Sequence, residues 1–323
     1  MAPQRGVTVA TTDFPLYTIQ PVGDSHLLVA GGGGQAKTGV PNAVEIYCLS
    51  PLDGSCILTK VEHVETSAGP AMNGCVGTDN KNQIVSAFGI DGSCYVYRLR
   101  PKVITQKVEE TGSVQTDFSS GDGYQRAVRF TQDISVMVTG GADGSLRTWK
   151  FPDLKKLYEV KAHTDEIDDV DISPSGNRIV TIGKDCKAFV WNTKDGSKKT
   201  ELHWDCRKDA KYKFRACSDN GVYLGVGTMS GSVSIYISFS LQKLYHLSKV
   251  HKIFVTGLSF AHSTEKALAI TGNHDTTLFS ISADNQIKMH QVAAQQRINP
   301  LFPILGFLFC IYLIYWIITT LGL

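Results

Sequence analysis

The residues most suggestive of chemistry lie near the N-terminus, in the stretch LLVAGGGGQAKTGVPNAVEIY at positions 27–47. Within it, GGGGQAKT differs by one residue from the pattern G-x-x-x-x-G-K-[ST], whose backbone N–H groups surround phosphates at the start of a helix. Ala36 stands where that pattern has glycine, and Thr38 is followed by Gly-Val-Pro-Asn, which favours a turn over a helix. The stretch therefore predicts a glycine-rich loop and not a phosphate site.

Three weaker patterns could also suggest chemistry. The eight cysteines include no C-x-x-C pair, so we expect reduced thiols and no zinc or redox site. The acidic stretch HTDEIDDVD at 163–171 offers carboxylates to a cation, but it overlaps the start of a repeat, which favours a structural role. The basic cluster RKDAKYKFR at 207–215 alternates as a solvated strand face does. With a formal net charge of +2, no nucleic acid partner is expected.

The C-terminal end contains a run of 21 apolar and uncharged residues, LFPILGFLFCIYLIYWIITTL at 301–321. A run of this length predicts a transmembrane helix, whereas a buried core helix would normally carry a polar stripe. The N-terminus lacks the apolar region of a signal peptide, and Lys288 and Arg297 precede the run, which predicts a cytosolic body. We therefore expect a cytosolic domain at 1–298 and a membrane anchor at 299–323, of a length that suits the thinner endoplasmic reticulum membrane.

The rest of the chain repeats one unit, a β-rich run followed by a short turn and a strand that ends in an aromatic residue. Copies occur at 86–99, 137–151, 179–193, 224–238 and 279–292, in addition to 27–47. The strands close at Tyr47, Tyr97, Trp149, Trp191, Tyr236 and Met289. Their spacings of 50, 52, 42, 45 and 53 residues are near the WD-repeat period of about 40–45. The pattern predicts an all-β, WD-repeat-like β-propeller with six repeats that can be counted, although the length would also hold seven.

One copy, AHTDEIDDVDISPSGNRIVTIGKDCKAFVWN, has the residues of a WD hydrogen-bonded tetrad. These are His163, Thr181, Asp185 and Trp191. We interpret them as structural and not catalytic, because a buried polar network is stable only when each member has a partner.

The first repeat carries a longer turn than its siblings. Sixteen residues separate Gly31 from Tyr47, whereas 9 separate Gly140 from Trp149. Four consecutive glycines leave the backbone free to surround an ion or approach a partner. Val40, between glycine and proline, would present an apolar side chain on a stiffened tip, which favours partner binding over an idle surface loop.

Together, these motifs resemble one family. FPLY at 14–17, VAGGGG-x-x-KTGVPN at 29–42, the WD-like repeats and the C-terminal apolar run are similar to the prolactin regulatory element-binding protein family, the membrane-bound guanine nucleotide exchange factors for the Sar GTPase of COPII vesicles. The resemblance covers essentially the whole chain, although the chain looks shorter than typical animal members. It implies a seven-bladed propeller on the cytosolic side of the endoplasmic reticulum, held by a single C-terminal membrane span.

The resemblance also implies residue roles and partners. The loop that contacts the GTPase and promotes exchange would contain Thr38, Gly39, Val40, Pro41 and Asn42, flanked by Lys37. The backbone ligands of a potassium ion would be Gly31, Gly32, Gly33 and Gly34. The implied partners are a Sar-type small GTPase, the endoplasmic reticulum membrane and COPII-organising proteins. An exchange factor performs no bond chemistry, so no catalytic residues are expected. The alternative is a non-catalytic, membrane-tethered WD-repeat scaffold, since most propellers are interaction platforms.

Overall fold

The computed structural model describes residues 6–35, 39–53, 55–66, 68–79, 83–99, 109–121, 123–173, 175–202, 212–217, 221–293 and 312. Its contacts divide the chain into two units, Met1–Val292 and Ala293–Leu323. The membrane-spanning segment predicted at 301–321 lies outside the described residues, apart from Tyr312. Within the part of the chain that the structure describes, no helix is both long enough and apolar enough to cross a membrane.

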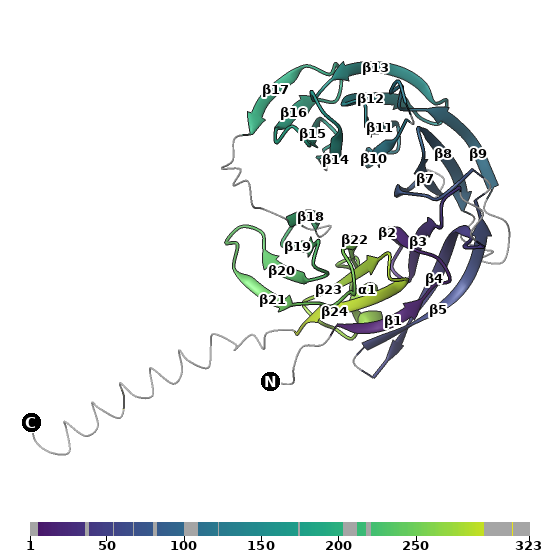
Figure 1. Cartoon of the computed structure of the whole chain (residues 1–323). Helices are drawn as coiled ribbons and strands as arrows, with labels where there is room; N and C mark the ends of the chain where they lie inside the picture. Colours follow the sequence, from purple (N-terminus) through teal and green to yellow (C-terminus); the bar gives the residue numbers. More distant parts are fainter. Residues whose placement is uncertain are drawn as a thin grey trace, which may run out of the picture. The chain divides into compact units, whose positions relative to one another are not determined.

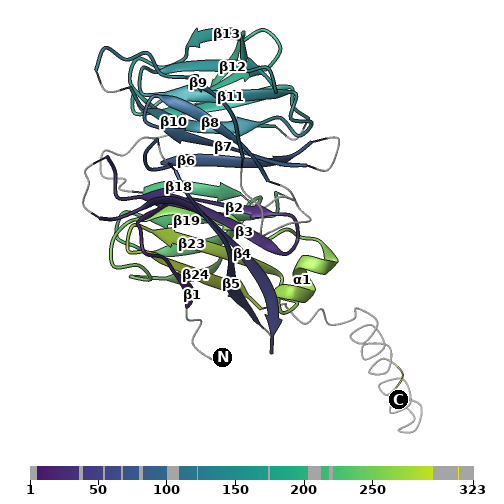
Figure 2. The same ribbon diagram turned by 90° about the vertical axis from the view of Figure 1, so that its right-hand side faces the viewer.

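The unit Met1–Val292 consists of four-stranded antiparallel sheets, or blades, around a common axis. Figure 1 shows them from one end of that axis and Figure 2 from the side. The first blade contains β2 (Leu16–Val22), β3 (His26–Gly32), β4 (Asn42–Leu52) and β5 (Ser55–Glu65). The second contains β6 (Asn73–Thr78), β7 (Ile84–Ile90), β8 (Ser93–Leu99) and β9 (Glu109–Gln115). The third contains β10 (Gln125–Phe130), β11 (Val136–Gly141), β12 (Ser145–Lys150) and β13 (Lys155–Lys161).

The remaining blades follow the same plan, except for the sixth, in which the first strand of the unit Met1–Val292 pairs with its last strand. The fourth contains β14 (Ile167–Ile172), β15 (Arg178–Gly183), β16 (Ala188–Asn192) and β17 (Lys198–Leu202). The fifth contains β18 (Tyr212–Cys217), β19 (Tyr223–Thr228), β20 (Val233–Ile237) and β21 (Lys243–Leu247). The sixth contains β22 (Val255–Phe260), β23 (Thr276–Ser282), β24 (Gln286–Val292) and, from the N-terminus, β1 (Val7–Thr11), with α1 (Glu265–Thr271) between β22 and β23.

The propeller therefore has six blades in the described residues, which confirms the six repeats and corrects the seven blades that the resemblance implied. The 24 described strands are all used in these six sheets. Between consecutive blades, the stretches outside the description are at most nine residues long, at 203–211. Nine residues are too few for four further strands, since strands average about 5–6 residues each.

Neighbouring blades pack through apolar side chains that alternate along the strands. Between the sixth and first blades, for example, Phe279 and Met289 pack with Leu27 in one buried cluster. Comparable clusters lie between the first and second blades, the second and third, the third and fourth, and the fifth and sixth. Because these five pairs of blades bury apolar side chains against each other, the ends of the strands, where the turns lie, remain available at the surface.

The predicted tetrad of the fourth blade is confirmed. His163 Nδ1 lies 2.8 Å from Asp185 Oδ1, and His163 Nε2 lies 2.8 Å from Thr181 Oγ1. The indole Nε1 of Trp191 donates to the same hydroxyl at 2.9 Å. Thr181 is fully buried and His163 nearly so. The network thus ties the connection before β14 to the hairpin of β15 and β16.

The sixth blade has a related network in which histidine replaces tryptophan. His251 lies between Asp284 Oδ1 at 3.1 Å and Ser280 Oγ at 2.8 Å, and Ser280 also lies 2.8 Å from Nε2 of His290. The other ring nitrogen of His290 lies 2.9 Å from the Tyr245 hydroxyl of the fifth blade. The repeat pattern predicted Met289 as the closing residue here, but Met289 belongs to the apolar cluster and His290 occupies the position of Trp191.

The buried His290 makes stability depend on pH. Burial, with nearby His251 and Lys288, lowers the pKa of His290 to about 3 from the ordinary 6.5. Below pH 6.5 the His290 side chain is therefore protonated in the unfolded chain, whereas in the folded protein it stays neutral down to about pH 3. The free energy of unfolding should fall as the pH drops through this window, by about 1.4 kcal/mol per pH unit from His290 alone. Burial also lowers the pKa of His251, which acts in the same direction.

Urea unfolding of the wild type and His290→Gln between pH 7.5 and 5 measures this effect. The Gln variant should lose less stability on acidification, because it cannot titrate. The same change at the half-buried His262 serves as the control. An equal pH dependence in the wild type and His290→Gln would contradict the assignment.

Candidate functional site

The long turn of the first blade leaves β3 at its glycines, two of which allow close backbone approach. A Cβ on Gly31 would lie 1.9 Å from the carbonyl oxygen of Pro15, and one on Gly32 would lie 2.1 Å from Oδ1 of Asn42. The N–H of Gly32 donates to the Pro15 carbonyl at 3.0 Å. Gly31 and Gly32 are the last residues of β3. A side chain on Gly31 would displace the backbone at Pro15, and one on Gly32 would displace Asn42 at the base of the loop.

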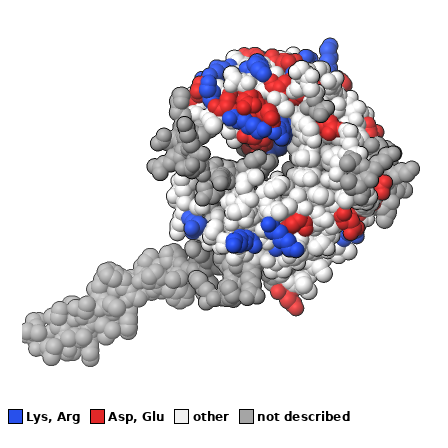
Figure 3. All heavy atoms as spheres, in the orientation of Figure 1, with Lys and Arg blue, Asp and Glu red and all other residues white. Residues whose placement is uncertain are grey.

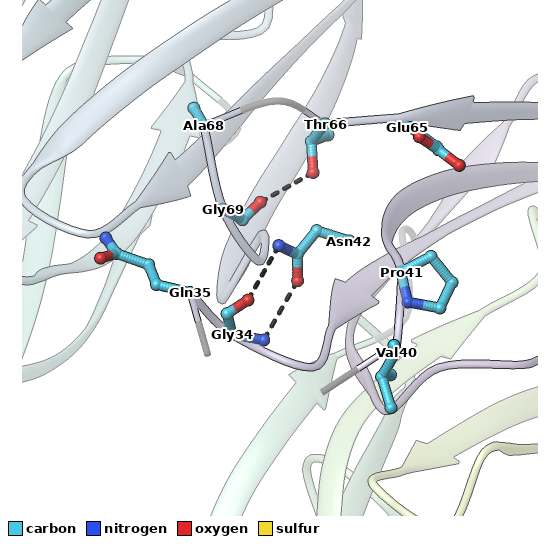
Figure 4. A pocket seen from close by; sticks show the side chains of 10 residues that line it. Gly34, Gln35, Val40, Pro41, Asn42, Glu65, Thr66, Ala68 and Gly69 are labelled. Carbon is cyan, nitrogen blue, oxygen red and sulfur yellow. Dashed lines mark hydrogen bonds between the residues drawn. The ribbon is translucent and has the colours of Figure 1, made fainter. Parts of the chain in front are cut away.

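Asn42 holds the base of the loop together. Its Oδ1 accepts the N–H of Gly34 at 3.1 Å, and its Nδ2 donates to the carbonyl of Gly34 at 3.1 Å, as the dashed lines in Figure 4 show. The carbonyl of Asn42 accepts the N–H of Thr66 at 2.8 Å, and the Thr66 hydroxyl donates to Gly69 at 2.7 Å. One side chain thus ties the two arms of the loop to each other, while its backbone is tied to the end of β5.

Val40 lies outside this hydrogen-bonded base and is exposed. Its side chain is 36% accessible, and a Cβ on Gly33 would lie only 2.5 Å from the Cβ of Val40. Gly39, which precedes it, has a φ of 80°, in the left-handed region that favours glycine. Pro41, which follows, restricts the backbone on the other side. The predicted apolar side chain is therefore presented beside the base of the loop, and Figure 4 shows it pointing away from Asn42.

Strand β4, which begins at Asn42, is anchored by a buried carboxylate that the sequence analysis did not identify. Glu45 is fully buried and accepts from the Tyr47 hydroxyl at 2.6 Å and from Lys60 Nζ at 2.9 Å. Nδ1 of His63 lies 2.9 Å from the same carboxylate oxygen as Lys60. Burial and the hydrogen bond to Glu45 raise the pKa of Tyr47, so that its hydroxyl stays a donor. The network ties β4 to β5 directly below the loop.

The loop also contacts the second blade. Nε2 of Gln35 donates to Oδ2 of Asp91 at 2.7 Å, across the boundary between the two blades. Asp91 starts the tight β7–β8 turn with a φ of 49°. A hollow next to the loop is lined by Gln35, Pro41, Asn42 and Glu65, among others. The first arm of the loop is therefore positioned by its neighbour as well as by its own blade.

The other predicted site residues divide into those the structure describes and those it does not. Lys37 and Thr38 lie outside the described residues, whereas the four glycines and Gly39 to Asn42 lie within them. Asn42 contacts Gly34 directly and so joins the predicted cation residues to the predicted exchange residues. Among the described residues, no group of three or more His, Cys, Asp or Glu side chains could hold a metal ion, including the acidic stretch from His163.

The glycine turn suits a monovalent cation better than a divalent one, because its donors would be neutral backbone oxygens. Gly34 accepts one hydrogen bond from Asn42, which leaves its carbonyl a second acceptor position. Gly31 and Gly32, by contrast, lie within β3, opposite Ala43 and Asn42 of β4, and their backbones are fixed by the sheet, whereas Gly33 and Gly34 lie beyond the strand. The carbonyls of Gly33 and Gly34 therefore fit the predicted cation site better than those of Gly31 and Gly32.

The charges on the face shown in Figure 3 are of both signs. Basic and acidic side chains lie next to each other above the central opening, and no broad patch of one sign covers the described residues of that face. Among the described residues, Glu166 forms an ion-pair cluster with Arg126 and, at 2.8 Å, with Lys184. Such paired charges contribute more to the orientation of a partner than to binding energy.

Comparison with known proteins identifies both the repeat and several relatives. Residues 154–192 match the family model "WD domain, G-beta repeat". The guanine nucleotide-exchange factor SEC12 of Mus musculus is 29% identical, with 92% of this chain and 93% of that protein covered, and the Rattus norvegicus protein matches equally. SEC12-like protein 1 of Arabidopsis thaliana is 36% identical over 75 residues, which cover 23% of this chain and 19% of that protein.

The alignment with the mouse protein also bears on chain length. It runs over 398 positions, whereas this chain has 323 residues. The mouse protein therefore has segments inside the aligned region that this chain lacks.

The contacts of Asn42 predict how the loop responds to substitution. Asn42→Ala removes both hydrogen bonds to Gly34, each worth about 1 kcal/mol. The amide of Gly34 should then exchange with deuterium on the order of tenfold faster, which hydrogen–deuterium exchange can measure. Asn42→Asp, which still accepts but cannot donate, should fall between Asn42→Ala and the wild type.

Asn177→Ala, at an asparagine that orders a turn of the fourth blade, is the matched control and should leave Gly34 unchanged. Equal exchange at Gly34 in Asn42→Ala and the wild type would mean that Asn42 does not hold the loop.

Proposed function

The chain is homologous to guanine nucleotide-exchange factor SEC12 along nearly all of its length, and from this homology we propose that it is a guanine nucleotide exchange factor for a Sar-type small GTPase. The single observation that supports this proposal most is the fixed base of the first-blade loop with an exposed valine beside it. A loop that must enter another protein needs a preorganised backbone, because each ordered residue would otherwise cost conformational entropy on binding. The scaffold alternative is not favoured, since it requires neither the enlarged turn nor its order.

Exchange requires no bond chemistry from this chain. The arrangements Asp185–His163–Thr181 and Asp284–His251–Ser280 have the composition of an acyl-transfer triad. The hydroxyl groups of Thr181 and Ser280 are fully buried, however, so no substrate could reach them. We interpret both as structural tetrads that hold the propeller together.

The mechanism is a coupling of two binding equilibria. A factor that binds the nucleotide-free GTPase more tightly than the GDP-bound form must, by thermodynamic reciprocity, weaken the binding of GDP by the same factor. Val40 and the adjoining backbone of Gly39 and Pro41 would displace a switch segment of the GTPase that helps hold GDP and its magnesium ion. Asn42 fixes the base of the loop beside these residues, and Lys37 and Thr38, which precede Gly39 in the sequence, would extend the contact.

The site of action follows from the C-terminal apolar run. We propose that residues 301–321 hold the protein in the endoplasmic reticulum membrane with a single span and with the propeller facing the cytosol. Confinement to one membrane would raise the effective concentration of the factor where the GTPase is to be loaded. Activation there would initiate COPII coat assembly and transport to the Golgi, and COPII-organising proteins are further candidate partners.

Val40→Asp tests the role of the loop. The substitution places a charge where an apolar contact is proposed and should abolish the acceleration of GDP release from a purified Sar-type GTPase, followed by the intrinsic fluorescence of the GTPase. The fold should be retained, because Val40 is exposed. Val40→Ile keeps an apolar side chain and should retain most activity. The full-length chain in detergent micelles is the form to use, and unchanged exchange by Val40→Asp would remove this residue from the mechanism.

A potassium ion bound by the carbonyls of Gly33 and Gly34 would hold the glycine turn in one conformation. Exchange measured in potassium, sodium and tetramethylammonium chloride at equal ionic strength should then be fastest in potassium and slowest in the organic cation. GDP release by the GTPase alone in each salt provides the correction for effects on the GTPase. Equal acceleration in all three salts would exclude a cation requirement.

A further inference from the structure

A second hollow begins where the first-blade loop ends. Gly34 and Gln35 line the hollow beside Asn42 and also a neighbouring cavity of about 570 Å³. That second cavity continues over the β7–β8 turn to the β9–β10 connection, where it is lined by Asp91, Gly92 and Asp117, among others. The two hollows therefore lie next to each other, with Gly34 and Gln35 lining both, and together extend from the first blade to the start of the third. We call these two neighbouring hollows the trough.

Hydrogen bonds connect the parts of this trough. Gln35 contacts Asp91 at 2.7 Å, and the carbonyl of Asp91 accepts the N–H of Gln125 at 2.7 Å. The carbonyl of the next residue, Gly92, accepts the N–H groups of Thr116 at 2.9 Å and Asp117 at 3.0 Å. The β9–β10 connection is thus fixed to the same turn that fixes the loop.

Asp117 determines the conformation of this connection. Its Oδ1 accepts from the N–H of Ser119 at 3.0 Å and from the Ser119 hydroxyl at 2.6 Å, and its Oδ2 accepts the N–H of Asp143 at 2.9 Å. Oδ2 of Asp143 in turn lies 3.3 Å from the N–H of Phe118. The backbone of Phe118 is therefore held from both sides by carboxylates.

The Phe118 side chain is nevertheless 53% exposed. Its ring centroid lies 4.9 Å from the guanidinium carbon of Arg147 and 5.9 Å from Nζ of Lys156. Arg147 is buried and pairs with Asp143 at 2.5 Å and Glu159 at 2.8 Å, so it offers the ring a fixed support. A large aromatic side chain that packs on a buried, paired arginine and is still exposed is typical of the residues that dominate a protein interface.

Phe118 also lies at the correct end of the propeller. Strands alternate in direction within each blade, so the β3–β4 loop, the β7–β8 turn and the β9–β10 connection all lie at one end of the sheets. The β20–β21 turn, which carries the exposed Phe239, lies at the opposite end. A partner seated on the first-blade loop can therefore reach Phe118 but not Phe239.

We infer that the surface that binds the GTPase continues from the first-blade loop along this trough and that Phe118 is its second apolar contact. This inference rests on the proposed function. The two apolar contacts have different roles, because Val40 acts where nucleotide is released, whereas Phe118 contributes equally to docking before and during release. Loss of such uniform binding energy raises the half-saturating concentration and leaves the maximal rate unchanged.

The test compares initial rates of GDP release over a range of GTPase concentrations, with full-length chain in detergent micelles. Phe118→Ala should raise KM for the GTPase about tenfold, as a contact worth about 1.4 kcal/mol would, and change kcat less than twofold. Phe118→Leu should fall between Phe118→Ala and the wild type. Phe239→Ala is the matched control at the opposite end and should behave as the wild type. The thermal unfolding midpoint should be the same in all variants, since both phenylalanines are exposed.

The outcomes separate this inference from the proposed function. If wild type accelerates release, Val40→Asp does not, and Phe118→Ala matches wild type, the second contact is wrong and the exchange function stands. A fall in kcat at unchanged KM for Phe118→Ala would also overturn docking as its role. If folded wild type does not accelerate release at any concentration, both the proposed function and this inference are wrong.

Discussion

The ladder between β1 and β24 is the constraint on which the propeller depends, because it joins residues from the two ends of the domain in one sheet. Thr12 just after β1 continues the link, with its N–H donating to the carbonyl of Asn285 at 2.9 Å. Closure entropy grows only with the logarithm of the loop length, by about 0.6 kcal/mol per doubling, so a short ladder can hold ends that are distant in sequence. It brings the sixth blade against the first, where Phe279 and Leu27 share one core. The strand ends of the first blade, and hence the loop, are fixed by this closure.

The loop itself combines a rigid base with an exposed apolar residue. Asn42 can hold both arms because its amide presents a donor and an acceptor side by side, so that it accepts from the N–H and donates to the carbonyl of Gly34. Below it, the buried Glu45 would be costly if it were alone, but three donors from β4 and β5 surround it. Beside it, Gln35 extends the same support to the second blade. The conformation of the loop is thus fixed by Asn42, by the Glu45 network and by the second blade.

Features made by neighbours in sequence could be predicted, and features made across strands could not. The tetrad around His163 was predicted because its members fall at fixed positions of a single repeat. The substitution of His290 for tryptophan was missed, because it depends on the register of β23 and β24, and the apolar Met289 beside it fits the repeat pattern as well. Two partners of Glu45, Lys60 and His63, lie on the neighbouring strand β5, with Lys60 beyond a register shift, and the partner of Gln35 lies in another blade. Neither pairing leaves a signal in the local sequence.

The number of blades was corrected from the seven implied by the resemblance to the six that the described residues form. The six repeats could be counted from the sequence, whereas a seventh blade was compatible with the length and implied by the resemblance. The mouse relative has segments within the aligned region that have no counterpart in this chain. The number of blades in longer proteins therefore does not determine the number here. The membrane anchor, the tip of the loop at Lys37 and Thr38, and the cation remain predictions, since they lie outside what the structure describes or contains.

The place of β24 in its sheet determines how the propeller carries mechanical load. The chain continues toward its C-terminal apolar run directly from this strand, which is paired on one side with β23 and on the other with β1. A load that enters the domain from its C-terminal side would therefore act on a strand held by two hydrogen-bonded ladders, and not on the edge of its blade.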